Sequence, residues 1–489
     1  MSDIRTRFCP SPTGTPHVGL VRTCLFSWGH ARHHDGGFIF RIEDTDAARD
    51  SEESYNQLLE ALTWLGLNWD EGPDIGGPYG PYRQSERGDV YQDVIAKLID
   101  AGYVYEAFST ADEVKARHEA AGRDPQLGYD NFDRDLTDGQ KEAFRAEGRK
   151  PVFRMRMPDE DITIDDFVRG EVTYPAGTIP DYVIARGDGS PLYTLTNPVD
   201  DALQKVNVVV RGEDLLPSTP RQVVLWRALT ELGLADGVPS YAHLPLIVDE
   251  RGKKMSKRDP RSNLLQYKEE GYLPEGVLNY VATLGWAIGP DRDVFTVKEF
   301  LASFDLHDVK SNPARFDDKK FRAICSDHFR SVDSGHLAEL VVPFLQDRGL
   351  LPEAPSSDQM DVLRTAMPMV QERSANLAEA AEMLRFLFAG DDFAIDPDHA
   401  KKGFKEGADA VLDASVEALE ALPEWTTEAI EAALKDALVE KMGLKPRKAF
   451  APVRVAVSGK TVSPPLYESM ELLGREVSLR RLRDARATL

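Results

Sequence analysis

The chain has 489 residues, of which 42% are hydrophobic and 29% charged, an ordinary composition for a soluble protein of several domains. No apolar run approaches the length of a membrane-spanning helix, and residues 1–8 lack the apolar stretch of a secretory signal. The three cysteines, Cys9, Cys24 and Cys325, show no CxxC spacing, which excludes a disulfide framework and a cysteine-rich zinc site. We therefore expect a cytoplasmic protein without a membrane partner.

The net charge of −23, from 59 basic and 82 acidic side chains, argues against indiscriminate binding of nucleic acid. Charges act only over a Debye length of about 8–10 Å. A local basic stripe therefore leaves a specific RNA partner open.

The first 42 residues predict the start of a parallel α/β sheet. Residues 4–8 are typical of a strand, about 17–34 of a helix, and 37–42 of a second, buried strand. A loop rich in proline, glycine and threonine joins the first strand to the helix, at the edge of the sheet where such folds bind nucleotides.

The pattern changes after two further predicted helices, 52–65 and 86–100. From about 103 to 191, charged helical stretches mix with short alternating strands such as 152–157. We interpret this part as an insertion within the nucleotide-binding fold.

Parallel-type strand character returns at 206–210 and again at 242–248. A helix between them is predicted to begin at Ser218 or Thr219, with Pro220 in its first turn. Beyond about 262 we expect mainly helices, and helical spacing is clearest at 378–388 and 427–441.

The loop at 10–20 places His17 and Gly19 at the predicted start of a helix. Free backbone N–H groups and the helix dipole favour phosphate there, and a glycine lets an adenine approach the backbone. A turn rich in proline and glycine, with a helix-capping histidine, is the structural alternative.

A second motif, at 254–258, sets Lys254 and Lys257 around the small Ser256. Mobile cationic loops close on triphosphates and neutralise charge as pyrophosphate leaves. The alternative is a solvated basic loop.

Three carboxylates lie at 41–46, directly after a predicted buried strand. No histidine nearby completes a metal-binding set, so we expect substrate recognition, with Glu43 on an amino group. An acidic helix cap is the alternative for 44–46.

Arg7 lies on a predicted buried strand and Arg211 directly follows the end of another, where a guanidinium is costly unless it is paired. Its planar fork suits a carboxylate, of a ligand or of a structural ion pair. Tyr193 and Asn197 lie on a stretch that we predict to be a strand, so that alternate side chains face one side. A core tyrosine is the alternative for Tyr193.

The motifs at 10–20 and 254–258, in this order, resemble the two ATP-binding signatures of class I aminoacyl-tRNA synthetases. With the segments 7–14, 41–46, 80–87, 198–201 and 218–220, the chain resembles the bacterial glutamyl-tRNA synthetases nearly from end to end. The resemblance implies an α/β fold: a Rossmann-type parallel-sheet catalytic domain with an inserted α/β acceptor-binding domain, followed by an all-α C-terminal anticodon-binding region. The implied limits are 1–84 and 196–245 for the catalytic domain, 85–195 for the insertion, 246–315 for the second signature and a helical stem-contact domain, and 316–375 and 376–489 for two anticodon-binding domains.

The resemblance also implies roles for individual residues. The glutamate pocket would be formed by Arg7, Cys9, Ser11, Glu43, Tyr193, Asn197 and Arg211. ATP, accompanied by Mg²⁺, would contact His17, Gly19, Lys254, Ser256 and Lys257, of which His17, Lys254 and Lys257 would be catalytic. Contacts to tRNA would come from Arg373, Lys445, Arg447 and Lys448, with Lys441, Arg454, Arg480, Arg481, Arg483 and Arg486 as further basic candidates. Charges that only solvate the helices are the alternative for all of them.

Some residues depart from the family pattern. Leu215 stands at a pocket position that is aromatic in some relatives, and Cys9 stands where some have alanine. The segment 106–108 lacks the cysteines that bind zinc in some members, so we expect no structural zinc and no protein-bound metal.

In the implied activity, L-glutamate and ATP form glutamyl-adenylate and pyrophosphate. The glutamyl group is then transferred to the 3′ end of tRNA(Glu) and AMP is released, in a cytoplasmic monomer. Whether tRNA(Gln) is also charged is left open, and the family's need for bound tRNA before activation is carried over as a hypothesis. The alternatives are a glutaminyl-tRNA synthetase, a shorter relative that glutamylates a tRNA base, and a non-catalytic synthetase-like tRNA-binding protein. Intact His17, Gly19, Lys254 and Lys257 argue against the last.

Overall fold

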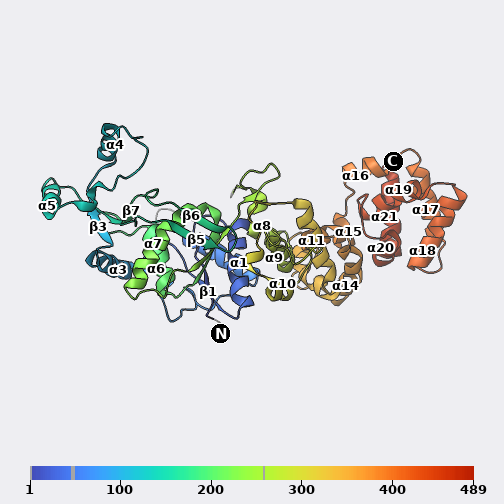
Figure 1. The fold of residues 1–489 in the computed structure, drawn as a ribbon. Helices are drawn as coiled ribbons and strands as arrows, with labels where there is room; N and C mark the ends of the chain where they lie inside the picture. The colour runs from blue at the N-terminus through green and yellow to red at the C-terminus, as the bar shows by residue number, and fades with distance from the viewer. Residues whose placement is uncertain (1–2, 46–49, 257–258) are drawn as a thin grey trace. The chain divides into compact units, whose positions relative to one another are not determined.

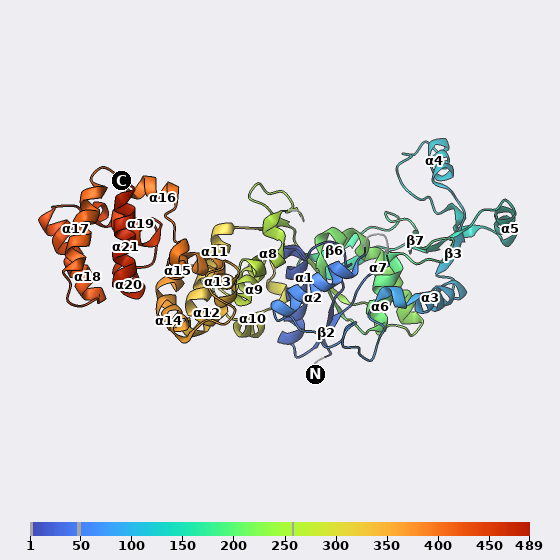
Figure 2. The same ribbon diagram turned by 180° about the vertical axis from the view of Figure 1, so that it is seen from behind.

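The computed structural model describes residues 3–45, 50–256 and 259–489. The chain divides into two compact units. The N-terminal unit comprises Met1–Lys268 and Val277–Asp318, and the helical unit comprises Glu269–Gly276 and Lys319–Leu489. Figure 1, and Figure 2 from behind, show strands and helices mixed in the first and helices throughout the second. Within the described ranges, no helix has the length and apolar character needed to cross a bilayer.

The predicted opening of the fold is confirmed. Strand β1 (Arg5–Phe8) pairs in parallel with β2 (Gly37–Phe40), and helix α1 (Val18–His33) connects them. His17 is the N-cap of α1, and its Nδ1 accepts the N–H of Leu20 at 3.2 Å. The loop between β1 and α1 therefore lies at the carboxyl end of the sheet.

A four-stranded sheet with the order β6-β5-β9-β8 continues this layer. Strand β8 (Val208–Gly212) is parallel to β9 (Ser240–Leu244), which is parallel to β5 (Ile162–Asp166), and β6 (Gly170–Tyr174) closes the edge in antiparallel. A backbone hydrogen bond from Asn207 to Arg5 sets β8 beside β1. The hairpin β5–β6, from the stretch we predicted to be an insertion, thus extends the sheet that carries β8.

Helices pack beside this sheet and against one another. Helix α2 (Glu52–Trp64) is capped by Ser51, and α7 (Thr219–Glu231) packs against β5. Helix α6 (Tyr193–Leu203) packs against α7 and against α3 (Gly88–Asp100). The predicted strand at Tyr193 and Asn197 is wrong, because these residues form the first turns of α6. Leu195, Val199 and Ala202 bury one helical face, and this packing overrides the strand propensity of the local sequence.

The remaining part of the predicted insertion has a small antiparallel sheet of β3 (Val104–Ala107), β4 (Val152–Met155) and β7 (Tyr182–Ala185). Helices α4 (Ala111–Ala120) and α5 (Asp138–Ala146) each begin with a capping box. The rest of the N-terminal unit contains β10 (Ile247–Val248) parallel to β11 (Ala314–Arg315), and the helices α8 (Leu264–Glu269), α9 (Pro274–Ala282) and α10 (Val297–Ser303).

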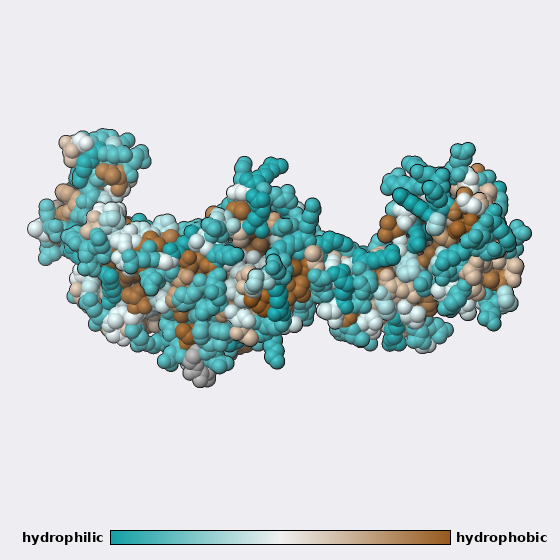
Figure 3. All heavy atoms as spheres, turned by 45° about the vertical axis from the view of Figure 1, so that its right-hand side comes forward, coloured by the Kyte–Doolittle hydropathy of each residue, from teal (hydrophilic) through white to brown (hydrophobic). Residues whose placement is uncertain are grey.

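The helical unit is built on two hydrophobic cores. The first includes Phe329, Leu363 and Leu384, and the second includes Leu412 and Leu482. The helices are α11 (Asp318–Ser331), α12 (Ser334–Leu340), α13 (Val342–Gln346), α14 (Ser357–Gln371), α15 (Leu377–Phe388), α16 (Pro397–Gly403), α17 (Ala408–Glu420), α18 (Thr427–Leu434), a π-helical segment (Lys435–Lys441), α19 (Pro446–Ser458), α20 (Leu466–Leu473) and α21 (Arg475–Ala487). The face in Figure 3 is mainly hydrophilic with scattered apolar patches. The predicted fold class is confirmed, while the predicted domain limits stay predictions.

Buried ion pairs hold α6 against the carboxyl ends of β1 and β2. Asp201, on α6, lies 3.1 Å from Nε of Arg7 and 2.8 Å from Nη1 of Arg41. Arg41 is fully buried and its other terminal nitrogen lies 3.1 Å from Glu43. Although burial alone would raise it, the two arginines lower the pKa of Asp201, so this carboxylate stays ionised.

The neighbouring Asp200 joins α3 to the same network. Its carboxylate accepts from Nε of Arg87 at 2.6 Å, from Nε2 of Gln84 at 2.8 Å and from the Tyr91 hydroxyl at 2.8 Å. Asp200 is fully buried and Arg87 is only 3% exposed, so each charge depends on the other for its solvation.

The variant Asp200→Ala removes the only carboxylate that the described residues place within ion-pair distance of Arg87. An uncompensated buried charge costs about 3–5 kcal/mol. We expect the free energy of unfolding of the N-terminal unit to fall by that amount, measured by chemical denaturation. Asp93→Ala is the control, since Asp93 is exposed and pairs with Lys97 one turn away, and it should change stability by less than about 0.5 kcal/mol. Equal losses in both variants would contradict this account.

Candidate active site

Two adjoining cavities open at the carboxyl ends of β1 and β8. The strand-end cavity, of about 400 Å³, is lined by Arg7, Phe8, Cys9, Pro10, Ser11, Leu20, Thr23, Glu43, Tyr193, Val210, Arg211, Gly212 and Leu215. The α1 cavity, of about 240 Å³, is lined by His17, Gly19, Leu20, Arg22, Thr23, Gly212, Asp214, Leu244, Pro245, Leu246, Ile247, Lys254, Met255, Ser256 and Ser262. Leu20, Thr23 and Gly212 line both, so ligands in the two cavities would meet there.

Two buried arginines, Arg7 and Arg211, line the strand-end cavity, and Arg211 differs from Arg7 in its partners. Nε of Arg211 donates to Nε2 of His243 at 3.0 Å, Nη1 to Gln222 at 2.6 Å and Nη2 to the hydroxyl of Thr219 at 2.8 Å. The ring of Tyr241 lies 5.3 Å below the guanidinium. All these partners are uncharged. No carboxylate among residues 3–45, 50–256 and 259–489 lies within ion-pair distance of Arg211, so this cation is available to an anionic ligand.

Glu43 provides the opposite charge in the same cavity. Its Oε1 accepts from Nδ2 of Asn197 at 2.6 Å and from Arg41 at 3.1 Å. Burial raises the pKa of Glu43, although Arg41 and Asn197 oppose the shift. Asn197 also lies 3.6 Å from Sγ of Cys9, so α6 brings these three predicted residues together.

The arginines around the strand-end cavity differ in their ionic contacts. The ionic side chains of this cluster are Arg7, Arg41, Arg87 and Arg211 against Glu43, Asp200 and Asp201. Among the described residues, Arg211 is the one guanidinium of this cluster without a carboxylate in direct contact, because the buried Asp166 reaches it only through His243. A buried cation without such a contact is costly unless a ligand provides one, which favours a ligand with net negative charge.

The other predicted pocket residues differ in exposure. Cys9 is largely buried, and burial raises the pKa of its thiol to about 12, so the sulfur is a neutral wall rather than a nucleophile. Ser11 is exposed at the rim, and Tyr193 is 37% exposed. A core tyrosine, the alternative weighed for Tyr193, does not fit that exposure.

The α1 cavity lies against the start of α1. A Cβ built on Gly19 would approach Nδ1 of His17 at 3.4 Å and Ile247 at 4.0 Å, which are ordinary contacts. Packing within the protein therefore does not require glycine here. The bare backbone instead leaves room in the cavity at the start of a helix, where the helix dipole favours phosphate.

The second signature lines the far wall of the α1 cavity through Lys254 and Ser256. Nζ of Lys254 lies 3.3 Å from Asp214, and both side chains are more than half exposed, so the pair is weak. Lys257, predicted to be catalytic, lies outside the described residues.

In the segment at 41–46, Asp44 has a structural role that differs from that of Glu43 in the cavity. Asp44 accepts from the N–H of Ser85 at 2.9 Å and from its hydroxyl at 2.8 Å, which fixes a turn of the backbone. Helix α2 is capped by Ser51, so Asp44 is not its cap. Asp46 lies outside the described residues.

The basic residues predicted for the helical unit fall into two groups. Lys445, Arg447 and Lys448 are exposed at the start of α19, and in the described part of the chain no carboxylate lies within ion-pair distance of them. Arg373 is exposed too, with Nη1 donating to the backbone of Ser463 at 2.7 Å. These cations remain available to an anionic partner.

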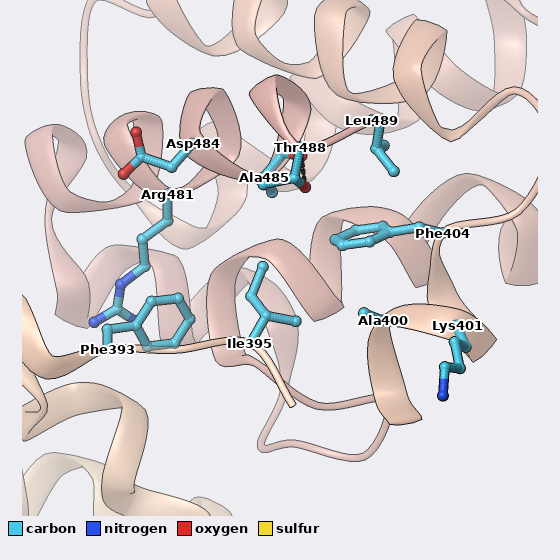
Figure 4. Close-up of a pocket in the computed structure, with 10 residues that line it drawn as sticks. All are labelled: Phe393, Ile395, Ala400, Lys401, Phe404, Arg481, Asp484, Ala485, Thr488 and Leu489. Carbon is cyan, nitrogen blue, oxygen red and sulfur yellow. Dashed lines mark hydrogen bonds between the residues drawn. The ribbon is translucent and has the colours of Figure 1, made fainter. Parts of the chain in front are cut away.

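The remaining basic candidates have partners within the protein. Carboxylates pair with Lys441, Arg480, Arg483 and Arg486, and backbone carbonyls accept from Arg454 and Arg481. Arg481 also stacks on Phe393 at the edge of a hollow of about 570 Å³, drawn in Figure 4. For this second group, the alternative of charges that serve only the helices fits the structure better than a role in tRNA binding.

Sequence reasoning did not identify Asp166, Thr219, Gln222 and His243 as parts of the site. All four are buried polar side chains, and the chain places them on β5, β9 and α7. A histidine within the apolar run 240–244 was a signal, because a buried imidazole needs partners.

Comparison with known proteins agrees with this architecture. Residues 3–323 match the catalytic domain of class I tRNA synthetases (E and Q), and residues 336–486 match an anticodon-binding domain. The chain belongs to this family of class I tRNA synthetases. It is 63% identical to a glutamate–tRNA ligase of Saccharopolyspora erythraea, over 98% of this chain and 95% of that protein. It is 59% identical to one of Rhodococcus jostii, over 99% of each.

A solved structure supports the likeness in three dimensions. The crystal structure of a glutamate tRNA ligase from Elizabethkingia meningosepticum, in complex with its amino acid, has a TM-score of 0.84 and 31% identity. It covers 100% of both chains.

The pKa of Cys9, raised to about 12, makes its reactivity predictable. Because the thiolate is the reactive form, alkylation by iodoacetamide at pH 8 should be at least about a hundredfold slower than for a free cysteine. Peptide mass spectrometry after timed quenching measures the rate at each cysteine. A rate for Cys9 close to that of glutathione would show that the thiol is not buried as described.

Proposed function

We propose that this protein is a glutamate–tRNA ligase: it activates L-glutamate with ATP to glutamyl-adenylate and transfers the glutamyl group to the 3′ end of tRNA(Glu). The observation that carries the proposal is the buried Arg211, which has neutral partners and lies in the same cavity as Glu43. Membership of the family and the relatives named glutamate–tRNA ligase support it.

Glutamate matches the cavity in charge and in chemistry. Its two carboxylates and one ammonium give a net charge of −1, and one of the carboxylates can supply the direct anionic contact that Arg211 lacks. Three of the five N–H groups of Arg211 have protein partners, and the other two suit a carboxylate. In the proposal Arg211 and Arg7 bind the carboxylates, Glu43 binds the ammonium, and Cys9, Ser11, Tyr193 and Asn197 form the walls.

ATP is proposed for the α1 cavity, accompanied by Mg²⁺. The exposed backbone at Gly19 suits adenine, while His17, Lys254, Ser256 and Lys257 suit the phosphates. Because the two cavities share walls, the α-carboxylate of glutamate would lie next to the α-phosphate. The carboxylate oxygen bonds to phosphorus, pyrophosphate leaves, and the lysines stabilise the departing charge.

The second step needs tRNA, whose terminal ribose hydroxyl attacks the activated carbonyl and releases AMP. Lys445, Arg447, Lys448 and Arg373 are the proposed anticodon-side contacts, supported by their exposure. The proposal keeps the predicted insertion, 85–195, for the acceptor end. It also includes a monomer in the cytoplasm, where tRNA is charged for protein synthesis.

A glutaminyl-tRNA synthetase is the rival within the family, since the matched model covers both amino acids. Glutamine is neutral overall and would leave the charge of Arg211 uncompensated. The neutral partners of Arg211 therefore favour glutamate.

Charging assays test the proposal. The purified protein is incubated with ATP, Mg²⁺ and labelled glutamate or glutamine, with tRNA(Glu) and tRNA(Gln) in separate reactions. Glutamate on tRNA(Glu) is the expected product, and glutamate on both tRNAs would identify a non-discriminating enzyme. Charging with glutamine instead, or no charging by folded protein, would refute the proposal. ATP–pyrophosphate exchange with and without tRNA tests whether activation awaits tRNA.

Glu43→Gln removes the proposed partner of the ammonium while keeping the shape. Losing a charged hydrogen bond of about 1.5–3 kcal/mol should raise KM for glutamate by about ten- to a hundredfold, with little change in KM for ATP. Because the pKa of Glu43 is raised, kcat/KM for glutamate should decline with falling pH earlier than for an ordinary carboxylate, and the variant should lack that decline. Glu52→Gln, on an exposed glutamate paired with Arg83, is the control. A wild-type KM in Glu43→Gln would remove Glu43 from the site.

The triple variant Lys445→Ala, Arg447→Ala, Lys448→Ala tests whether the exposed cations at the start of α19 bind tRNA. We expect a higher KM for tRNA and a salt dependence of tRNA binding reduced by up to about two units of log slope, with amino-acid activation unchanged. The triple variant Lys401→Ala, Lys435→Ala, Lys441→Ala changes the net charge equally but removes lysines that already have acidic partners. Identical effects of the two triples would indicate general electrostatics instead of contacts.

A further inference from the structure

A line of three buried side chains runs from the edge of the sheet to the strand-end cavity. Asp166 ends β5, His243 lies on β9 and Arg211 lies on β8. Oδ2 of Asp166 lies 2.6 Å from Nδ1 of His243, and Nε2 of His243 lies 3.0 Å from Nε of Arg211. His243 is fully buried and does not line either cavity, so any effect on a ligand passes through Arg211.

We propose that His243, held by Asp166, is a positioning residue that orients the Arg211 guanidinium for the amino acid and thereby contributes to the affinity for glutamate. This inference rests on the proposed function, because it assigns a second layer of side chains to the same pocket.

The hydrogen bonds determine which nitrogen of His243 carries the proton. Nε2 faces the Nε–H of Arg211 at 3.0 Å and the hydroxyl of Thr219 at 3.0 Å. An arginine can only donate, so Nε2 is an acceptor and the proton lies on Nδ1, which donates to Asp166. A carboxylate at this place selects the one tautomer that can hold Arg211.

Asp166 is itself fixed by the backbone. Oδ1 accepts the N–H groups of Val168 at 3.0 Å and Arg169 at 2.9 Å, and Oδ2 accepts the N–H of His243 at 3.1 Å. Burial opposes the charge, but the hydrogen bonds of His243 and the backbone lower the pKa of Asp166. The carboxylate is thus ionised and rigid, and the turn between β5 and β6 sets its place.

The position of the guanidinium has few other determinants. Gln222 and Thr219 hold its two terminal nitrogens from α7, and Tyr241 supports one face. Among the residues that the structure describes, His243 alone accepts from Nε, the atom that fixes the angle of the guanidinium relative to the strand. Without that acceptor, the guanidinium can rotate about its stem, and the two free N–H groups lose their alignment with the cavity.

Neutral His243 is essential to this arrangement. The groups around the imidazole are Asp166 on β5, Arg169 in the following turn, Arg211 on β8, Thr219 on α7 and Tyr241 on β9. Burial lowers the pKa of His243, Arg211 and Arg169 add to this shift, and Asp166 opposes it without reversing it. Protonation would make His243 a third cation beside Arg211 and Arg169. Its new Nε2–H would also face the Nε–H of Arg211, so that two donors would oppose each other.

The test compares two substitutions at one position in charging assays of the full chain with tRNA(Glu). His243→Leu removes the acceptor, and His243→Gln offers an amide oxygen at about the place of Nε2. We expect His243→Leu to raise KM for glutamate about tenfold or more, with KM for ATP and tRNA within about twofold. His243→Gln should restore KM for glutamate to within about threefold of wild type. His30→Leu, on a buried histidine outside both cavities, should leave all three constants unchanged.

A second variant keeps the test decisive if His243→Leu does not fold. Asp166→Asn keeps the size of the side chain but no longer selects the tautomer, and it should raise KM for glutamate selectively. Wild-type KM for glutamate in folded His243→Leu or Asp166→Asn, or equal rises for glutamate and ATP, would overturn the inference. If the wild type does not charge tRNA with glutamate, the proposed function and this inference fall together; if only the variants disagree, the inference alone falls.

Discussion

The site depends on a buried network of charges in which, among the described residues, every arginine except Arg211 has a carboxylate in direct contact. Asp200 and Asp201, adjacent on α6, together with Glu43 neutralise Arg87, Arg41 and Arg7 at the carboxyl ends of the first strands. Taking so many charges out of water is tolerable only because each has a partner in good geometry. Arg211 is the exception, since its partners are an imidazole, an amide and a hydroxyl. The protein therefore carries the stability cost of a buried cation with these neutral partners, at the place where a negatively charged amino acid would bind.

This arrangement connects the fold to the chemistry. Parallel strands bring β1, β8 and β9 to one edge, and the start of α1 opens beside them, so a pocket for a carboxylate and a pocket for a phosphate share a wall. No side-chain nucleophile is required, because the reaction joins two substrates held next to each other. Even Cys9, the nearest thiol, is kept neutral by burial.

Much of the fold was predictable, because it follows from local patterns. The strand at 37–40 was predictable from its apolar residues, and the start of α1 from the proline- and glycine-rich loop before it. His17 caps α1 because it is the last residue of that loop. The strand predicted around Tyr193 was wrong because Leu195, Val199 and Ala202 are buried by tertiary packing of α6, which a short window does not reveal. The contribution of β5 and β6 to the sheet was missed for the same reason: a single bridge, Asp166 to Tyr241, joins segments far apart in sequence. Candidate residues such as Arg7, Glu43 and Arg211 could be selected by type and position. Their partners could not, since Asp166, Thr219, Gln222 and His243 meet only in the folded chain.

The central claim is that Arg211, a buried cation without a direct carboxylate partner among the described residues, selects an anionic amino acid. The most direct test is to measure kcat/KM for glutamate and for glutamine, and to compare the ratio of the two in the wild type and in Arg211→Gln. Losing one buried charge partner corresponds to about 2–5 kcal/mol. The account predicts a strong preference for glutamate in the wild type that falls at least about thirtyfold in the variant, through the loss of glutamate use. An unchanged ratio in a folded Arg211→Gln protein would contradict it, because the selectivity would then have to come from Arg7 or from the shape of the cavity.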